Sequence, residues 1–494
     1  MSNTMAKQGG SGSDKASPAS TSPREAMLAV LQRQREAFLR ELPVSAELRK
    51  DRLRRTVDLV VANKERLAKA LCSDFGQRSA TSTMLTDIMT TVRPLRHAIK
   101  HVEAWMKPES RPLDLPLRIF GARAHVEYQP KGVIGVIAPW NLPIMLIFTP
   151  LAQAFAAGNR AMVKPSEFTP CTSELVTELV QRHFDPAELA MFPGDQEVGR
   201  AFAGLPFDHL LFTGATAIGR HILHAAADNL VPTTLELGGK SPVIVGESAD
   251  TRRTTQRVMM GKLMNAGQIC LAPDYLLVPK GREEAVVQGL TQAVTAMYPT
   301  MLENEDYTSI INRRHRERLQ SLVADAREHG AEVVEINPAK EDFTAAAVTK
   351  LPVYILRKVN ERMRVTREEI FGPVLPVLTY EHIDEAIDYV NRGERPLGLY
   401  YFGDSRDEER RVLDRTVSGG VTVNDVLFHG AAEELPFGGI GASGMGAYHG
   451  REGFRTFSHA KGIYHQPRID LSGLVGFRPP YGSKTRKTLK REVG

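Results

Sequence analysis

Three side chains of the sequence could take part in covalent or acid–base chemistry. Cys270 ends the segment Gly267–Cys270, where a thiol stands beside glycine and amide side chains, and a thiolate is a strong nucleophile. Glu236 ends an apolar run and is a candidate general base, and Asn141 could donate a side-chain N–H to an oxyanion. Each also has an ordinary interpretation: a buried small hydrophobe, an ion pair with Lys240, and a turn asparagine.

Two further segments could bind a phosphorylated cofactor. Lys164 and Glu167 follow a predicted strand and could both hydrogen-bond a ribose, although the same segment also reads as a helix start with Ser166 as its N-cap. The segment Gly214–Gly219 opens a predicted helix, whose first backbone N–H groups suit a pyrophosphate. Its spacing is GxxxxG and not GxGxxG, so a plain turn between strand and helix fits it equally well.

The elements that must position these residues form an alternating series. Ser22 to Met106 shows the apolar spacing of amphipathic helices. From Lys131 onward, short apolar runs alternate with helical stretches, which is typical of parallel sheets with helices on both faces. We therefore predict an α/β fold with two doubly wound parallel-sheet domains. The predicted strands are Val133–Ala138, Ala161–Lys164, Leu189–Phe192, His209–Phe212, Thr234–Leu237, Val243–Val245, Tyr275–Val278, Val353–Ile355, Val374–Leu378, Leu399–Phe402 and Gly420–Val423.

Composition and charge exclude several classes of protein. The chain has 494 residues with 42% hydrophobic and 24% charged side chains, which is an ordinary globular balance. The net charge of +5 equals that of the last 17 residues, Arg478 to Gly494, with six basic side chains and one acidic. The rest of the chain is formally neutral, so we expect no nucleic-acid partner. Residues 133–157 carry no charge, but three prolines interrupt them, so we expect a buried strand and helix and no membrane span.

The three cysteines indicate the compartment. Cys72, Cys171 and Cys270 give no disulfide framework and no metal-ligand spacing, so we expect no metal and a cytoplasmic location. We expect Cys72 and Cys171 to be small buried residues. Residues 1–24 are rich in Ser, Gly, Ala and Pro and lack an apolar run, which predicts a disordered leader without a signal peptide.

The order of the motifs resembles that of the aldehyde dehydrogenase superfamily, over roughly Leu48 to Gly462. Gly261–Gly267 and Ser443–Gly450 are similar to its class 3 branch, and Asp74–Ser79 is similar to the bacterial coniferyl aldehyde dehydrogenases within that branch. The motifs are Pro139-Trp140-Asn141, Lys164-Pro165-Ser166-Glu167, Phe212-Thr213-Gly214, Glu236-Leu237-Gly238-Gly239-Lys240, Gly267-Gln268-Ile269-Cys270, Glu368-Glu369-Ile370-Phe371-Gly372-Pro373 and Pro436-Phe437-Gly438-Gly439.

The resemblance implies a mechanism. Cys270 would add to the aldehyde carbonyl, and Asn141 with the backbone N–H of Cys270 would form the oxyanion hole. Hydride would pass to NAD, with NADP as an alternative cofactor, and leave a thioester. Glu236 would activate the water that hydrolyses it. The alternatives are a CoA-acylating enzyme, against which Glu236 counts, and a catalytically silent binding paralogue, against which the intact site residues count.

The resemblance also implies a cofactor site. Lys164 and Glu167 would hold the adenosine ribose and Glu369 the nicotinamide ribose, with Phe371 packed near the nicotinamide. Trp140 and the turn formed by Gly214, Ala215, Thr216 and Gly219 would contact phosphates. The family often has Ser where this chain has Ala215, so one hydroxyl contact is lost while the backbone donors remain.

Finally, the resemblance implies a division of the chain and a class of substrate. The substrate would be a bulky apolar or aromatic aldehyde such as coniferyl aldehyde, with Leu142, Met145, Ile269, Leu271 and Leu427–Ala431 around the entrance. A small β-strand arm would join subunits into a homodimer or homotetramer. The predicted segments are a leader (1–24), an NAD-binding domain (25–235) with an arm segment near 113–129, a catalytic domain (236–435), a return to the cofactor domain with the second arm segment (436–466, arm strand about 454–465) and a basic tail (467–494).

Overall fold

The N-terminal part of the chain is helical, as predicted. The computed structural model describes residues 22–345 and 349–494, so residues 1–21 of the predicted leader lie outside the described residues. Residues 22–24 are wrongly placed in that leader, because Ser22 caps the first helix by accepting a hydrogen bond from the Glu25 amide. The helices here are α1 (Pro23–Glu41), α2 (Ala46–Ala62), α3 (Lys64–Phe75), α4 (Ala80–Thr83), the π-helix η1 (Met84–Ile88) and α5 (Met89–Trp105).

The first parallel sheet has six strands in the order β15-β7-β6-β3-β4-β5, with only β15 antiparallel. The strands are β3 (Val133–Ile137), β4 (Arg160–Lys164), β5 (Leu189–Met191), β6 (His209–Gly214), β7 (Thr233–Leu237) and β15 (Gly444–Met445). The order of the strands reverses between β3 and β6, and α/β sheets bind ligands at such a switch point. The predicted boundary between residues 235 and 236 falls inside β7, so Glu236 belongs to this sheet.

Helices cover this sheet, and the uncharged segment 133–157 forms β3 and a buried helix, as predicted. The helices are α7 (Pro143–Ala156), α8 (Pro170–His183), α9 (Gln196–Ala203) and α10 (Thr216–Ala227). The predicted N-cap at Ser166 is wrong, because α8 begins at Pro170 after Thr169. Among the described residues, no helix combines the length and apolar character that crossing a membrane requires.

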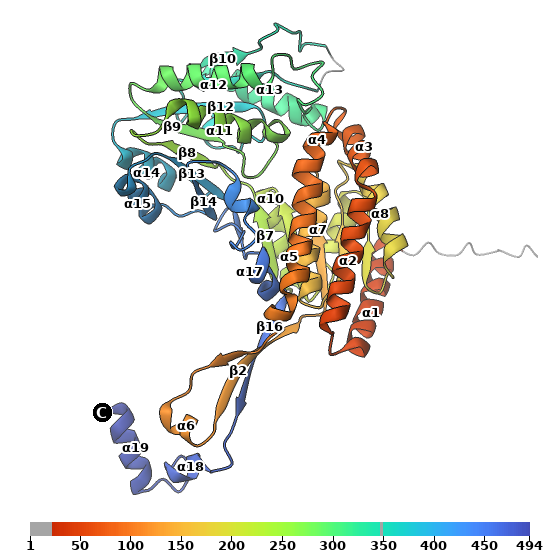
Figure 1. Ribbon diagram of the computed structural model, residues 1–494, viewed down its shortest axis with the longest axis vertical. Coiled ribbons are helices and arrows are strands. Elements are labelled where there is room, and N and C mark those ends of the chain that lie inside the picture. The colour runs from red at the N-terminus through yellow and green to blue at the C-terminus, as the bar shows by residue number, and fades with distance from the viewer. Residues whose placement is uncertain (1–21, 346–348) are drawn as a thin grey trace, which may run out of the picture.

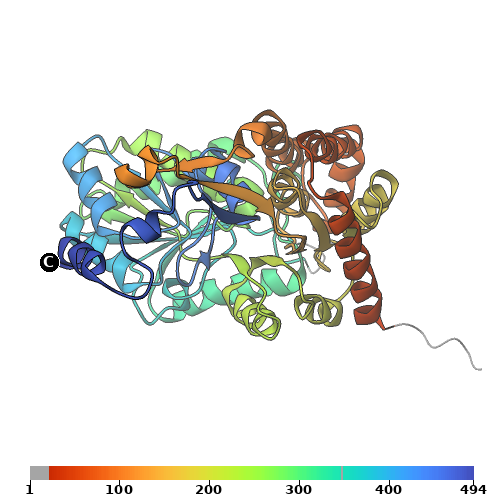
Figure 2. The same ribbon diagram turned by 90° about the horizontal axis from the view of Figure 1, so that it is seen from below.

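The second sheet has seven strands in the order β10-β11-β12-β9-β8-β13-β14. Its strands are β8 (Pro242–Val245), β9 (Tyr275–Pro279), β10 (Glu332–Ile336), β11 (Val353–Arg357), β12 (Val374–Tyr380), β13 (Gly398–Phe402) and β14 (Gly420–Val423). The apolar runs did not predict β10, an antiparallel edge strand in which only Ile336 is buried. The surrounding helices are α11 (Thr251–Leu263), the 3₁₀ turn η2 (Met264–Gly267), α12 (Glu283–Met297), α13 (Arg313–Glu328), the 3₁₀ turn η3 (Arg364–Thr366), α14 (Ile383–Arg392), α15 (Arg406–Arg415) and α16 (Phe428–Ala431). Seen from below, this domain and the N-terminal helices lie at opposite sides of the molecule (Figure 2).

A three-stranded antiparallel arm projects from the body (Figure 1). It consists of β1 (Glu109–Arg111), β2 (Arg123–Pro130) and β16 (Ser458–His465), with α6 (Leu115–Ile119) near its tip and α17 (Gly450–Thr456) leading into β16. The parallel-sheet domains and the strand arm confirm the predicted fold class. The arm differs slightly in extent from the predicted segments 113–129 and about 454–465, since β1 begins at Glu109 and β16 at Ser458.

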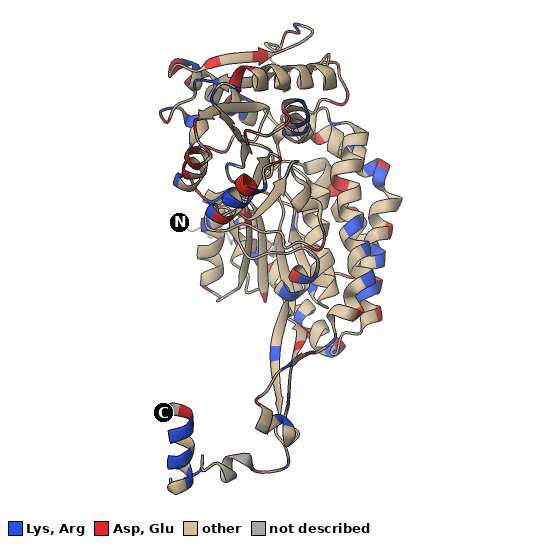
Figure 3. Cartoon of the chain, turned by 60° about the vertical axis from the view of Figure 1, so that its left-hand side comes forward, with Lys and Arg blue, Asp and Glu red and all other residues tan. Residues whose placement is uncertain are grey.

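The basic tail folds into helices beyond the arm. They are α18 (Leu471–Leu474) and α19 (Ser483–Val493), and the basic side chains of the tail gather on α19 (Figure 3). No residue of α19 is buried. The helical structure of the tail was not predicted from the sequence.

Candidate active site

A cleft of about 1150 Å³ runs along the carboxyl ends of β3, β4 and β6. Of the predicted cofactor residues, it is lined by Trp140, Lys164, Glu167, Gly214 and Ala215. Lys164 Nζ lies 2.6 Å from Glu167 Oε2, and the side chain of Glu167 is 39% exposed. Since Ala215 is the N-cap of α10 and has no side chain that can bond the first amides, these amides can donate to an anion. The cleft therefore offers free backbone amides and an exposed carboxylate at the carboxyl edge of the sheet.

Two of the predicted phosphate contacts have another role. Thr216 Oγ1 donates to the carbonyl of Ala442 at 3.1 Å, which ties α10 to the chain before β15. A Cβ atom at Gly219 would lie 2.8 Å from the Leu237 side chain, so this glycine lets α10 pack closely on β7. Neither residue lines the cleft.

Glu369 and Phe371, which were predicted to lie near the nicotinamide ribose and ring, belong to one loop that buried contacts hold in place. The Glu369 side chain approaches Gly238 so closely that a Cβ there would lie 2.0 Å from Glu369 Oε2. Burial raises the pKa of Glu369 to about 8, despite a hydrogen bond from the Gly239 amide. Phe371 adopts a φ of +54° and sets its ring edge-on to Trp140, with 5.5 Å between centroids. Glu369 and Phe371 thus lie near, but do not line, the cleft.

Lys240 anchors this loop and does not pair with Glu236. Its ammonium pairs with Asp274 and donates to the carbonyls of Val365 at 2.7 Å and Glu368 at 3.1 Å. Asp274 in turn accepts from the Ile370 amide at 2.9 Å. The alternative in which Glu236 is only a structural partner of Lys240 is therefore wrong.

Cys270 follows a sharp backbone turn at the end of α11. Asn265, Ala266 and Gly267 have φ values of +51°, +53° and +78°, and left-handed backbone is costly for alanine. Gly267 is needed here, because a Cβ would lie 2.5 Å from the carbonyl oxygen of Gly372. Gln268 holds the turn by donating to the carbonyls of Asn265 and Ser309, both at 3.0 Å. The turn fixes the direction in which the chain presents Cys270.

The carboxyl group of Glu236 is buried, and its charge acts on the half-buried thiol of Cys270. Burial, with the charges of Glu369 and Glu236, raises the pKa of Cys270 to about 12. Glu236 is buried, both of its carboxylate oxygens make no hydrogen bond within the described residues, and burial raises its pKa well above the ordinary value. In the cofactor-free protein, burial therefore favours the neutral form of both groups.

Asn141 is buried and clamped from two sides. Its side-chain amide donates to the carbonyl of Gln268 at 3.1 Å, which leaves a second N–H for another acceptor. The backbone carbonyl of Asn141 accepts hydrogen bonds from the side chains of Asn265 and Arg78, both at 3.0 Å. The segment of Asn141 and the turn before Cys270 are thus bonded directly to each other.

Sequence reasoning missed the ion pair behind Asn141. Arg78 and Asp87 are fully buried and pair with each other, and Asp87 also accepts from the Ile144 amide at 3.3 Å. Arg78 belongs to the motif Asp74–Ser79, but the motif does not indicate the pair, because the partner carboxylate comes from the π-helix η1. Tyr448 and His449 belong to the motif Ser443–Gly450, which assigned them no role. The Tyr448 hydroxyl is buried without a partner among the described residues, and the charges of Glu236 and Cys270 act on it.

The other two cysteines are more accessible than predicted. Cys171 is exposed and not buried as predicted, and Cys72 is half-buried.

His315 and Arg318 of α13 line the cleft from the second domain, where no motif marked them. The ring of His315 lies edge-on to Trp140, with 5.1 Å between centroids.

Breaking the buried ion pair between Arg78 and Asp87 is expected to destabilise the folded protein. Arg78→Met should lower the free energy of unfolding by about 3–5 kcal/mol, because it leaves Asp87 buried without its counter-charge. The double variant Arg78→Met/Asp87→Leu should recover much of the melting temperature, since apolar replacements of both partners remove the uncompensated charge. Its catalytic rate should nevertheless stay below that of the wild type, because the backbone carbonyl of Asn141 loses the hydrogen bond from Arg78. Calorimetry and steady-state rates measure both, and a single variant as stable as the wild type would contradict the prediction.

Comparison with known proteins shows consistent similarity along the chain. A family model described as "Aldehyde dehydrogenase family" matches residues 14–463. A "Probable coniferyl aldehyde dehydrogenase" of Caulobacter vibrioides is 54% identical over 94% of this chain and 96% of its own. A "Coniferyl aldehyde dehydrogenase" of Pseudomonas sp. (strain HR199) is 52% identical over 93% and 94%. "Aldehyde dehydrogenase family 3 member A2" of Macaca fascicularis is 36% identical over 87% and 86%.

Solved structures agree with these relatives. The substrate-bound state of Staphylococcus aureus AldH has a TM-score of 0.88 and 33% identity, covering 95% of this chain and 99% of that one. A mutant of the P. syringae indole-3-acetaldehyde dehydrogenase AldA, in complex with NAD⁺ and IAA, has a TM-score of 0.81 and 25% identity, covering 90% of each chain.

Proposed function

The chain belongs to the aldehyde dehydrogenase family, with similarity to the coniferyl aldehyde dehydrogenases and to class 3 members, and on that premise we propose its mechanism and substrate. It is an aldehyde dehydrogenase that uses a nicotinamide cofactor. We propose that it oxidises a bulky aromatic aldehyde, such as coniferyl aldehyde, to the carboxylic acid through a thioester on Cys270. The observation that carries this proposal is the buried carboxyl group of Glu236, which makes no hydrogen bond among the described residues and whose charge acts on the Cys270 thiol.

The first step is attack of Cys270 Sγ on the aldehyde carbon. With a pKa of about 12, the thiol must release its proton through water to the solvent as the C–S bond forms. The carbonyl oxygen becomes negative, and the free side-chain N–H of Asn141 and the backbone N–H of Cys270 stabilise it. When bound, the nicotinamide cofactor supplies the hydride acceptor that oxidises this adduct.

The second step is hydrolysis of the Cys270 thioester. Glu236 accepts a proton from a water molecule, whose oxygen attacks the thioester carbon. The C–S bond then breaks, the carboxylic acid leaves, and the Cys270 sulfur recovers a proton from Glu236. A raised pKa suits this task, because the conjugate acid then forms readily near neutral pH. In a CoA-acylating enzyme, the alternative function, a second thiol would replace the water and this base would be unnecessary.

We assign the cofactor contacts from the lining of the cleft. Lys164 and Glu167 hold the adenosine ribose, while Trp140 and the start of α10 at Gly214 and Ala215 face the phosphates. We place Glu369 at the nicotinamide ribose and Phe371 against the nicotinamide. Arg200 of α9 lines the same cleft and provides a positive charge that tolerates a 2′-phosphate, so the preference for NAD is a bias that leaves NADP usable.

Glu167→Gln is expected to reduce the ratio of kcat/KM for NAD over NADP by roughly fivefold. The wild-type carboxylate accepts from a ribose 2′-hydroxyl and repels a 2′-phosphate, and one charge at ~4 Å in water is worth about 1 kcal/mol. Glu174→Gln, an exposed carboxylate on α8, controls for a general change in charge. A wild-type kcat/KM clearly higher for NADP would refute the preference.

The residues proposed for the substrate entrance favour a flat, apolar ligand. Leu142, Ile269 and Leu271 are buried, and Phe428 of α16 is 57% exposed. Burying an aromatic ring against such side chains is favourable, whereas a second carboxylate would find no arginine among the proposed entrance residues.

A panel of aldehydes with both cofactors tests the proposed function. NADH formation with coniferyl aldehyde should exceed that with short polar semialdehydes, and added CoA should not accelerate it. Activity confined to the semialdehydes would reject the substrate class. A rate that depends on CoA would instead move the protein to the acylating function.

We further propose that the arm joins subunits into a homodimer or homotetramer in the cytoplasm. Its apolar side chains Leu115, Ile119 and Phe120 are 66%, 70% and 42% exposed, and contact with another copy of the chain would bury them. The three free cysteines favour a reducing compartment. Light scattering of the purified chain distinguishes the oligomers from a monomer, which would reject the first part of this proposal.

A further inference from the structure

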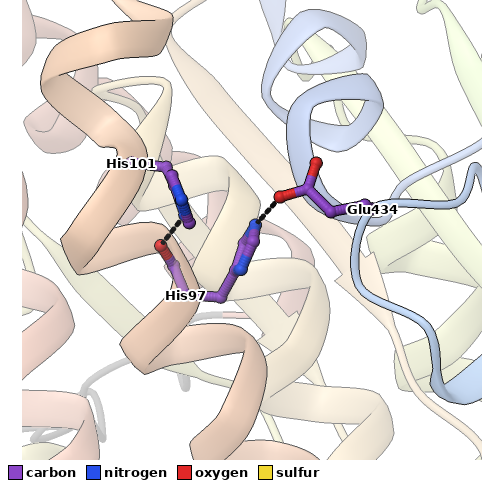
Figure 4. A group of neighbouring side chains, drawn as sticks. All are labelled: His97, His101 and Glu434. Atoms are coloured by element: carbon purple, nitrogen blue, oxygen red, sulfur yellow. Dashed lines mark hydrogen bonds and ion pairs between the residues drawn. The ribbon is translucent and has the colours of Figure 1, made fainter.

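Three potential metal ligands from two separate segments meet outside the active site. His97 and His101 lie one turn apart on α5, and Glu434 comes from the segment between α16 and β15 (Figure 4). One ligand atom from each residue lies within 4.8 Å of the other two. Among the described residues, no other group of histidine, cysteine and acidic side chains meets this condition.

The two imidazoles are already oriented. Nδ1 of His101 bonds the carbonyl of His97 at 2.9 Å, so its Nε2 keeps a free lone pair. Metal-binding histidines usually bond a carbonyl or carboxylate with their other ring nitrogen in this way. Trp105 packs against both rings, with centroid distances of 5.7 Å to His97 and 5.8 Å to His101, and so restricts their rotation.

The third ligand is close and can adjust. Nε2 of His97 lies 2.9 Å from Oε1 of Glu434 but makes no aligned hydrogen bond within the described residues. The side chain of His97 is 15% exposed and that of Glu434 is 68% exposed. Tetrahedral ligands at 2.0–2.1 Å from zinc are about 3.3 Å apart, so a modest rotation of the exposed Glu434 side chain closes the site.

We propose that His97, His101 and Glu434 form a binding site for a divalent transition metal ion, with zinc as the ion tested and water as the fourth ligand. Two imidazoles and one carboxylate suit zinc and its neighbours in the periodic table better than Mg²⁺ or Ca²⁺, which prefer oxygen ligands alone. The exposed carboxylate gives the ion a path from solvent.

Metal binding here joins two parts of the fold. Helix α5 packs against α7, and Glu434 stands three residues after the end of α16. A bound ion therefore fixes the segment that follows α16 to the helical block, and the folded state gains the free energy of binding.

The test measures binding of Zn²⁺ to a Cys171→Ser/Cys270→Ser background, which removes the exposed thiol and the reactive thiol as competing ligands. Equilibrium dialysis with elemental analysis should find one zinc per chain. His101→Gln and Glu434→Gln should each weaken binding by at least about tenfold. Zinc should also raise the Tm of the background protein and not that of these two variants.

His465→Gln is the matched control. His465 stacks on His125, with 5.4 Å between ring centroids, and Glu127 lies 3.3 Å from that second ring, yet this group lacks the convergent geometry. The control should bind zinc as the background protein does. If the background binds no zinc, or if His101→Gln and Glu434→Gln bind it equally tightly, the cluster is a His97–Glu434 ion pair and the proposal is wrong.

Discussion

Replacing Cys270 with alanine is expected to lower the rate of aldehyde oxidation by more than about a thousandfold, because covalent catalysis contributes several kcal/mol to the barrier. Cofactor binding should be unchanged, since Cys270 does not line the cleft that holds Trp140, Lys164 and Glu167. NADH formation measures the first quantity, and quenching of protein fluorescence by NAD measures the second.

Cys171→Ala is the matched control for this variant. The thiol of Cys171 is exposed on α8, outside the proposed machinery, so its loss should leave the rate unchanged. Retention of more than about a thousandth of the wild-type rate in Cys270→Ala would remove the thiol from the mechanism.

The Glu236→Gln variant should still form the acyl-enzyme but release it slowly. Stopped-flow absorbance should show a burst of about one NADH per active site, followed by turnover that is reduced ~10²–10⁴-fold, the usual contribution of a general base. Turnover close to that of the wild type would mean that Glu236 is not the base.

The pH dependence gives an independent readout of the same residue. A general base works when it is ionised, and burial raises the pKa of Glu236, so the acid limb of the wild-type kcat should lie above the ordinary range of a glutamate. As the pH falls through this limb, Glu236 takes up a proton and hydrolysis slows. Glu236→Gln has no such proton to take up, so its residual rate should lack this limb.

The sequence predicts the sheets well because parallel strands buried on both faces appear as continuous apolar runs. All eleven predicted strands are present, with ends that shift by a few residues. The edge strand β10 lacked that signal because only Ile336 of its five residues is buried. The helical basic tail was also missed, since α19 buries no residue that would give a helical apolar pattern.

The long-range contacts that hold the site together could not be predicted from the sequence. Motif order brought Cys270, Glu236 and Asn141 to attention, but long-range ion pairs leave no local pattern. The sequence around Lys240 does not indicate that Asp274 is its partner. The sequence around Arg78 likewise does not indicate its pairing with Asp87. The left-handed turn before Cys270 was equally hidden, because its alanine rarely adopts that conformation.

Glycines and threonines in a motif can also serve packing. Thr216 and Gly219 lie in the predicted phosphate turn, yet one bonds the chain before β15 and the other makes room for Leu237. A motif therefore locates the turn, and only the packing around it separates the residues that face the ligand from those that hold the turn in place.

The central claim is that oxidation passes through a thioester on Cys270 that Glu236 helps to hydrolyse. Mass spectrometry of Glu236→Gln, digested after brief incubation with coniferyl aldehyde and NAD, tests it most directly. We expect the peptide that contains Cys270 to gain the mass of the corresponding acyl group, and the Cys270→Ala variant to show no such gain. A peptide with an unmodified Cys270 while NADH is formed, or an acyl group on another residue, would contradict the account.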